Sequence, residues 1–302
     1  MTRQKSLSVP LHRKISSSAK MLLVTTIAQL RALLHEQRVA GKTIGLVPTM
    51  GALHAGHISL VRRSVVETGF TVVSDFVNPT QFNDKTDLAN YPRDIEADTR
   101  LLTEAGANVL FAPSVDEMYP EPDTREFSFP GIDDVMEGAF RPGHFNGVCQ
   151  IVSKLLYIVN PDRAYFGEKD FQQIAVVRAM VRELQIPSQI IACPIVREDG
   201  GLALSSRNLL LSEAEHKTAT NISRMLFASV DYSHEHNVEQ TKNFVIDALN
   251  HIEGLHVQYF EIVNALTLAK VSSWDDAEHI QGCITVFCGS KPIRLIDNIC
   301  YK

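Results

Sequence analysis

The chain has 302 residues, a formal net charge of −6 and a sequence pI near 6.0, which argues against an extended nucleic-acid-binding surface but leaves room for a local basic pocket. Hydrophobic residues make up 45% and charged residues 21% of it, as in ordinary globular proteins, and no apolar run approaches the ~20 residues of a membrane span. Its 5 cysteines form no CxxC pair and indicate free thiols in a reducing, cytoplasmic compartment.

Residues 1–20 differ in composition from the rest of the chain. They are rich in serine, lysine and arginine and contain no acidic residue. This composition is compatible with a transit peptide, with a disordered extension, or with a misassigned start ahead of Met21. We expect an extension that plays no part in catalysis.

The first motif of the folded part, VPTMGALHAGH, covers residues 47–57. Residues 42–48 predict a buried strand, and the apolar spacing from Gly56 onward predicts a helix. A strand, a glycine turn and a helix start point several N–H groups into one crevice, where an anion can bind. His54 and His57 lie at this turn, and both are expected to titrate near neutrality. The spacing alone is equally compatible with a plain turn and a capped helix.

Further strands and helices alternate along the first two thirds of the chain. This alternation predicts a doubly wound parallel sheet, in which ligands bind at the carboxyl ends of the strands. Asn78 and Gln81 follow one of these strands in a polar loop and are therefore candidates to hold a small polar substrate, although Asn-Pro also starts ordinary turns. The predicted strands after the first are 69–77, 108–112, 162–166 and 189–194, and 125–131 is predicted as a short hairpin arm.

Two later segments also suit an anion. The turn Gly167–Asp170 follows a predicted strand and carries Lys169, a compact positive charge for phosphate oxygens. The loop 202–208 contains Ser205, Ser206 and Arg207, which together supply several hydrogen-bond donors. A Ser-Ser-Arg loop alone is more often ordinary surface, so its weight comes from being the third such segment.

The composition changes after Val196, where a polar glycine-rich segment, 197–201, indicates a hinge. Two amphipathic helices and then several strands follow, which predicts a smaller α+β domain with a mainly antiparallel sheet. The expected division is therefore 21–196 and 197–302, with the second part acting as a lid. The helices are predicted at 212–230 and 238–251, and the strands at 257–263, 283–288 and 293–296.

Several spaced motifs, taken in order, resemble the pantothenate synthetase family. They are PTMGALHAGH at 48–57, FVNPTQF at 76–82, YPRD at 91–94, RPGHFNGV at 141–148, GEKDFQQ at 167–173, LALSSRN at 202–208 and RLIDN at 294–298. The resemblance runs from Met21 to the end of the chain and leaves out the first twenty residues. One departure is Asp75, at a position where the family usually has an apolar residue.

The resemblance implies a Rossmann-like, homodimeric ligase that joins pantoate to β-alanine, uses ATP and Mg²⁺, and forms a pantoyl-adenylate. It implies no nucleic-acid or membrane partner and identifies no metal ligand. Gln81 matches a contact to pantoate and β-alanine, Gln173 matches a contact to pantoate, and Asn78 is placed beside them. The implied catalytic residues are His57, His54, Lys169 and Arg207, and the implied ATP contacts are Met50, Gly51, Ala52, Leu53, His54, Ala55, Gly56, His57, Gly167, Glu168, Lys169, Asp170, Val196, Leu204, Ser205, Ser206 and Arg207.

Three other functions share the HxGH turn or the fold. Another HxGH nucleotidylyltransferase would act on a phosphorylated acceptor, but the neutral Gln81 and Gln173 do not suit a phosphate. A class I aminoacyl-tRNA synthetase would need a lysine pair that the 204–207 loop lacks and a tRNA-binding surface that an acidic chain does not offer. A catalytically silent nucleotide-binding protein would be expected to have lost His57 or Lys169.

Overall fold

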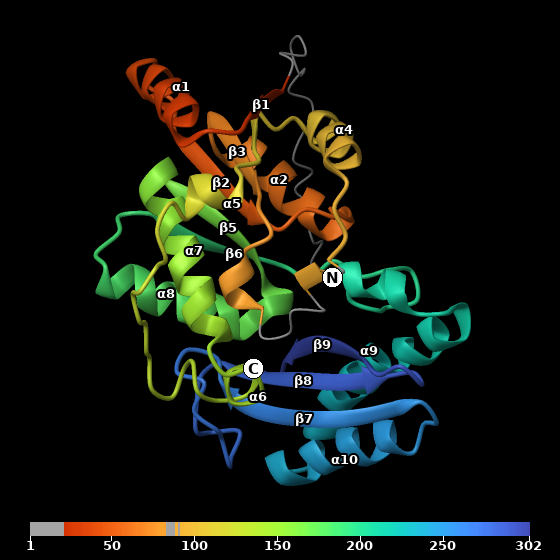
Figure 1. Cartoon of the computed structure of the whole chain (residues 1–302). Helices are drawn as coiled ribbons and strands as arrows, with labels where there is room; N and C mark the ends of the chain where they lie inside the picture. Colours follow the sequence, from red (N-terminus) through yellow and green to blue (C-terminus); the bar gives the residue numbers. More distant parts are fainter. Residues whose placement is uncertain (1–20, 83–87, 90) are drawn as a thin grey trace, which may run out of the picture.

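The computed structural model describes residues 21–82, 88–89 and 91–302, so the extension predicted over 1–20 lies outside the described residues. Six parallel strands form one sheet in the order β1-β4-β3-β2-β5-β6. The predicted doubly wound parallel sheet is confirmed (Figure 1). The strands are β1 (Leu22–Val24), β2 (Ile44–Thr49), β3 (Phe70–Asp75), β4 (Val109–Phe111), β5 (Arg163–Gly167) and β6 (Gln189–Cys193).

Helices cover both faces of this sheet, so the apolar side chains on both faces of its strands are buried. Leu46 packs into a core with α1 (Ile27–Val39), α7 (His144–Val159) and α8 (Phe171–Glu183). The adjacent Val47 points to the opposite face and packs with α2 (Ala55–Glu67) and α4 (Ile95–Ala105). Short helical turns connect these elements, namely η1 (Pro79–Gln81), α5 (Val115–Met118), α6 (Glu137–Phe140), η2 (Glu168–Asp170) and η3 (Ser206–Leu210).

A second, antiparallel sheet follows in the order β7-β8-β9. It lies below α7 and α8 in the view of Figure 1. Its strands are β7 (Leu255–Asn264), β8 (Ile280–Cys288) and β9 (Ile293–Cys300). The helices α9 (Glu213–Ser233) and α10 (Val238–Asn250) pack on it through a core that contains Leu226, Val245 and Val286. The predicted α+β part with its antiparallel sheet is confirmed.

One prediction about the strands was wrong, and one strand was not predicted. Residues 125–131 are not a hairpin arm, because this extended segment bonds to side chains, such as that of Asn146, which accepts from the Phe127 N–H at 2.8 Å. The edge strand β1 was not predicted, because it has only three residues, two of them exposed, which is too short for a recognisable period. The strands β8 and β9 are also longer than the predicted 283–288 and 293–296.

The order of the strands decides where a ligand can bind. β2 pairs with β3 on one side and with β5 on the other. From β2 the chain continues through β3 to β4 on one side of the sheet, and from β5 it continues to β6 on the other side. The loops that follow β2 and β5 therefore diverge and leave a crevice at the carboxyl ends of the two strands. These loops are residues 50–54 and the turn at 167–170.

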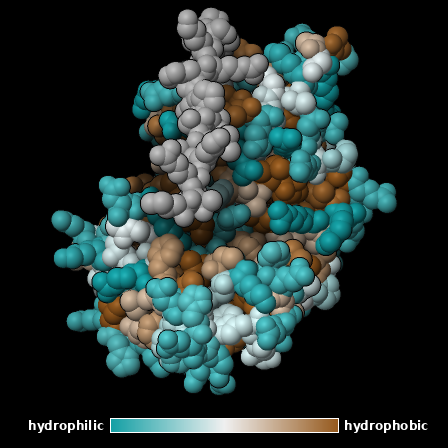
Figure 2. Space-filling model, turned by 180° about the vertical axis from the view of Figure 1, so that it is seen from behind, coloured by the Kyte–Doolittle hydropathy of each residue, from teal (hydrophilic) through white to brown (hydrophobic). Residues whose placement is uncertain are grey.

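The outer surface in the view of Figure 2 is mostly hydrophilic, as the ordinary content of charged and hydrophobic residues predicts. Hydrophobic residues gather in a band between the upper and lower parts of this face. Within the described ranges, no helix is both long enough and apolar enough to cross a membrane.

Candidate active site

A cavity of about 250 Å³ opens in the crevice between β2 and β5. The structure brings to its wall most of the predicted site residues, which come from five separate segments of the chain. Five predicted site residues are not part of the wall, namely Gly51, Ala52, Leu53 and Ala55 of the first motif and Glu168. The predicted residues that line it are Met50, His54, Gly56, His57, Asn78, Gln81, Gly167, Lys169, Asp170, Gln173, Val196, Leu204, Ser205, Ser206 and Arg207.

The two histidines form the capping box of α2. The Nδ1 atom of His54 accepts a hydrogen bond from the Gly56 N–H at 3.2 Å, and Nδ1 of His57 accepts one from the His54 N–H at 3.4 Å. Because Nδ1 is an acceptor in both rings, each neutral imidazole carries its proton on Nε2. The ring centroids are 4.1 Å apart. The helix start therefore sets out two neighbouring N–H donors.

Gly56 is required between these histidines. A Cβ atom at this position would lie 2.8 Å from Cε1 and 2.9 Å from Nδ1 of the His54 ring. Any side chain would push that ring out of its cap, so the motif needs glycine here for the fit of the two imidazoles.

The expectation that the histidines titrate near neutrality was wrong. Burial lowers the pKa of His57 to about 3, and the neighbouring His54 and Lys169 act in the same direction. Burial likewise lowers the pKa of His54 to about 4, with Lys169 the next largest cause. Both imidazoles are therefore neutral hydrogen-bond donors at pH 7 in this structure.

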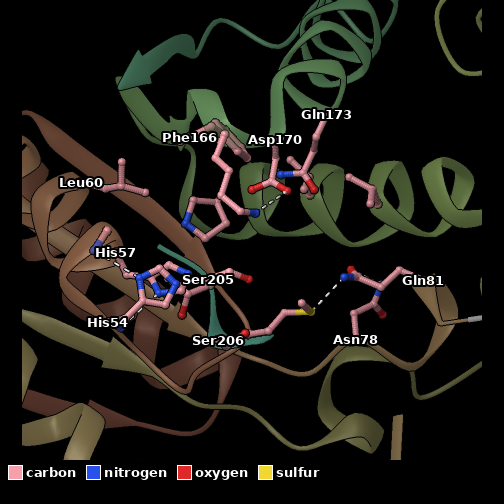
Figure 3. Close-up of a pocket in the computed structure, with 18 of the residues that line it drawn as sticks. His54, His57, Leu60, Asn78, Gln81, Phe166, Asp170, Gln173, Ser205 and Ser206 are labelled. Carbon is pink, nitrogen blue, oxygen red and sulfur yellow. Dashed lines mark hydrogen bonds and ion pairs between the residues drawn. The ribbon is translucent and has the colours of Figure 1, made fainter. Parts of the chain in front are cut away.

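Positive charge enters the same end of the cavity from two other segments. Lys169 lies in η2, directly after β5, and its Nζ atom is 3.5 Å from the Asp170 carboxylate. The serine loop is fixed by the Leu204 N–H, which donates to the Val196 carbonyl at 3.0 Å. Ser205 then caps η3 by accepting from the Arg207 N–H at 3.3 Å. Figure 3 shows Ser205 beside His54 and His57.

The other end of the cavity carries uncharged amide side chains. Figure 3 shows Gln81 and Asn78 here, away from the histidines, with the Gln81 amide donating to the Met50 sulfur at 2.9 Å. Asn78 is buried and donates to the Gln81 Oε1 at 3.3 Å and to the Gly147 carbonyl at 3.1 Å. Its own oxygen accepts from Tyr119 at 2.7 Å. Asn78 therefore holds the loop that presents Gln81.

This arrangement matches what comparison with known proteins finds. The sequence model of the family described as pantoate-beta-alanine ligase matches residues 22–300. The chain belongs to the pantoate-beta-alanine ligase family. Pantothenate synthetase from Bacteroides thetaiotaomicron is 62% identical over 282 residues, which are 93% of this chain and 99% of that protein, and the one from Phocaeicola vulgatus is 61% identical over 283 residues, 93% of this chain and all (100%) of that protein.

Solved structures agree with the pantoate-beta-alanine ligase assignment. Pantothenate synthetase from Thermus thermophilus has a TM-score of 0.86 at 43% identity, with 92% of this chain and 99% of that chain covered. Pantoate-beta-alanine ligase from Francisella tularensis, solved in complex with beta-gamma ATP and beta-alanine, has a TM-score of 0.77 at 34% identity, with 93% and 98% covered. Membership makes this chain a ligase with the Rossmann-like fold that the motifs implied.

Tyr91, Arg141 and His144 also line the cavity, and sequence reasoning gave them no role. Each stands in a motif that supported the resemblance, and this was the only signal that could have found them. His144 accepts from Arg141 through Nε2 at 3.1 Å, so its Nδ1–H donates to the Gln81 carbonyl at 3.0 Å. Burial lowers the pKa of His144 to about 4, which keeps this donor neutral.

Asp75, the departure from the family pattern, faces a second carboxyl group. Asp98 accepts from the Ala52 and Leu53 N–H groups at 2.9 and 2.8 Å and so holds the loop that ends at His54. Asp75 lies within hydrogen-bond reach of Asp98. Its pKa is raised to about 6, first by burial and then by Asp98, while Arg93 acts against this. Burial also raises the pKa of Asp98, so the pair is most stable when it shares one proton.

We expect Asp75→Asn to stabilise the protein, and more so at pH 8 than at pH 5. A carboxyl whose pKa is higher in the folded state loses its stabilising contribution as pH rises through that value. The rise in the pKa of Asp75 to about 6, discounted for the partial exposure of this side chain, corresponds to about 1 kcal/mol at pH 8, or about 2–4 °C in Tm. Thermal unfolding at both pH values measures this. The exposed Asp275→Asn is the control, and an equal change at the two pH values would contradict the shared proton.

Proposed function

We propose that this chain joins pantoate to β-alanine and cleaves ATP to AMP and pyrophosphate, through a pantoyl-adenylate. One observation carries the proposal, namely that a single cavity brings the cationic Lys169 and Arg207 and the histidine N–H donors together with the amide side chains of Gln81 and Gln173. The donors suit a triphosphate, and the amides suit a small hydroxy acid.

In the first step a pantoate carboxylate oxygen bonds to the α-phosphorus of ATP, and the bond from that phosphorus to the pyrophosphate oxygen breaks. The step brings an anion to an anion, so stabilising charge is the main task of the protein. His54 and His57 donate Nε2–H to phosphate oxygens, and Lys169 with Arg207 neutralises the departing pyrophosphate. Ser205 and Ser206 add hydroxyl donors on the same side, and the backbone of Met50, Gly167, Val196 and Leu204 borders the nucleotide.

Gln81 and Gln173 hold pantoate through its hydroxyl and carboxylate groups. Both side chains are uncharged, so they orient the carboxylate without reducing its nucleophilicity as an arginine would. Gln81 is also assigned to β-alanine, which would enter at the same end. In the second step the amine nitrogen of β-alanine bonds to the acyl carbon, the bond to the adenylate oxygen breaks, and AMP leaves as the nitrogen loses a proton.

Magnesium fits this site as an ion held mainly by substrate. No group of three or more potential His, Cys, Asp or Glu ligands occurs among the described residues. Asp170 is an acidic side chain of the wall, and Mg²⁺ typically takes one or two carboxylates with substrate phosphates. Asp170 would then be its protein ligand, and the ion would supply positive charge to the phosphates.

Three further assignments belong to the proposal. Residues 197–302 act as a lid on 21–196, because a pantoyl-adenylate must be protected from water. Support comes from the serine loop at 204–207, which belongs to the second part and lines the cavity of the first. The enzyme is a cytoplasmic homodimer, as its resemblance to the family implies.

Incubation with ATP and Mg²⁺, with and without pantoate and β-alanine, tests the proposal. We expect pyrophosphate release to require pantoate and AMP release to require β-alanine as well. Pyrophosphate release that is independent of pantoate would point to another HxGH nucleotidylyltransferase. The absence of any release would point to a silent nucleotide-binding protein.

We expect the overall rate under saturating substrates to rise between pH 7 and pH 9. β-Alanine must attack as the free amine, and an alkyl amine with a pKa near ~10 is almost wholly protonated at pH 7. His54 and His57 do not lower the rate over this interval, because both are already neutral at pH 7 and do not change protonation up to pH 9. Steady-state AMP formation against pH measures this, with pantoate-dependent pyrophosphate release as the reference step. A rate that falls over this interval would contradict the free-amine step.

A further inference from the structure

Strand β9, which is remote in sequence from the first motif, reaches the lysine turn. Asn298 is 3% exposed, and its Nδ2 donates to two consecutive carbonyl groups of η2, those of Glu168 at 2.8 Å and Lys169 at 3.1 Å. Both hydrogens of the amide are thereby used on the turn that carries Lys169. No side chain caps the N–H groups at the start of η2, and Asn298 instead fixes the turn through the carbonyl groups of the turn.

A second amide fixes the orientation of the first. Gln281 of β8 is buried, and its Nε2 donates to the Asn298 Oδ1 at 2.7 Å. The oxygen of Asn298 must therefore face Gln281, and its NH₂ group must face the turn. The chain of bonds runs from β8 through β9 to the backbone of Lys169.

The neighbouring residue of β9 holds the other cationic segment. Asp297 binds Arg197 through two hydrogen bonds, at 2.6 and 2.9 Å, and accepts from the Asn298 N–H at 2.8 Å. Arg197 begins the segment that leads to Ser205 and Arg207, and its backbone bridges Ala203. Two adjacent residues of one strand therefore fix both cationic segments of the cavity.

We propose that Asn298, oriented by Gln281, is a positioning residue that sets the backbone of Lys169 for the phosphates of ATP. The proposal rests on the function proposed above, in which Lys169 contacts the nucleotide. A displacement of about 1 Å at a reacting centre costs about 10²-fold in rate. Asn298 contacts the backbone of the turn, so its effect must pass through Lys169.

A double-mutant cycle between Asn298→Ala and Lys169→Met tests this. We expect Asn298→Ala alone to lower kcat/KM for ATP in pantoate-dependent pyrophosphate release by about 10- to 100-fold. In the Lys169→Met background the same change should cost less than about 2-fold, because the group that it positions is gone. Equal effects in the two backgrounds, or normal kinetics of Asn298→Ala, would overturn the proposal.

Two further variants separate positioning from stability. Gln281→Met leaves Asn298 in place but frees its amide, and we expect the same loss in weaker form, about 3- to 10-fold. If Asn298→Ala does not fold, this variant carries the test, and normal kinetics would refute the proposal. Gln258→Ala is the matched control, since it removes an amide of the same sheet that bonds to Arg294 and not to the turn.

ATP binding by calorimetry gives a readout that needs no turnover. We expect Asn298→Ala to weaken ATP binding in the otherwise unchanged protein but not in the Lys169→Met variant. If wild-type protein binds ATP and releases no pantoate-dependent pyrophosphate, the proposed function fails while this test still decides the role of Asn298. If the wild type is active and the cycle is additive, the positioning role alone fails.

Discussion

His57→Ala is expected to lose pantoate-dependent pyrophosphate release by about 10²- to 10³-fold, the usual cost of removing one preorganised donor to developing charge. His57 lies in the cavity wall at the start of α2, and its Nε2–H is fixed because Nδ1 accepts from the His54 N–H. The donor is neutral, so its loss removes a directed hydrogen bond without a net charge. Single-turnover release of pyrophosphate measures the effect directly.

His57→Asn is the matched variant for this residue. The Asn oxygen can take the place of Nδ1 and keep the cap on the His54 N–H, but asparagine has no group at the position of Nε2. We expect His57→Asn to be more stable than His57→Ala, by up to about 1 kcal/mol, and equally inactive. Exposed His35→Ala should behave as wild type. Near-normal turnover of His57→Asn would remove His57 from the catalytic residues and leave it as a helix cap.

Lys169→Met is expected to lower kcat/KM for ATP by about 10²-fold, because a partly buried ammonium that meets phosphate oxygens is replaced by an apolar side chain of similar length. Its side chain is 19% exposed, so water screens it less than it screens a surface lysine. Increasing salt should therefore have little effect on the ratio between wild type and variant. Initial rates at varied ATP measure the loss.

Two further variants serve as comparisons for Lys169→Met. Lys270→Met removes an ammonium whose side chain is 69% exposed and paired with Glu261, and it should leave kcat/KM unchanged. Lys169→Arg keeps the charge but replaces a point charge with a planar fork, so partial activity is expected. Full activity of Lys169→Met would exclude this lysine from phosphate binding and would also leave Asn298 without the group that it is proposed to position.

Much of the fold could be predicted from local pattern. β2, β3 and β5 bury both faces, so apolar residues stand next to one another in each of them instead of alternating with polar ones, which identifies parallel strands. β1 was missed because three residues at a sheet edge carry no period. The 125–131 segment was wrong because its extended backbone finds side-chain partners in place of a strand, and sequence cannot show which partner is near.

The residues of the candidate site also divide into those that the sequence predicted and those that it did not. His54, His57, Gln81 and Lys169 stand in local motifs and were found, whereas Tyr91, Arg141 and His144 were quoted within motifs without a role. The neutrality of the histidines was also beyond sequence, because a pKa depends on burial and on charges that arrive from other segments.

The sequence by itself determined the family, the two types of sheet and the segments that suit an anion, because local spacing and side-chain chemistry specify these features. Only the tertiary structure decided that the segments meet at the junction of β2 and β5, that Asp75 faces Asp98, and that β9 reaches the lysine turn. These are contacts between residues far apart in the chain. Asn298 and Lys169 are brought together by the contact of β9 with the turn η2, which no local pattern encodes.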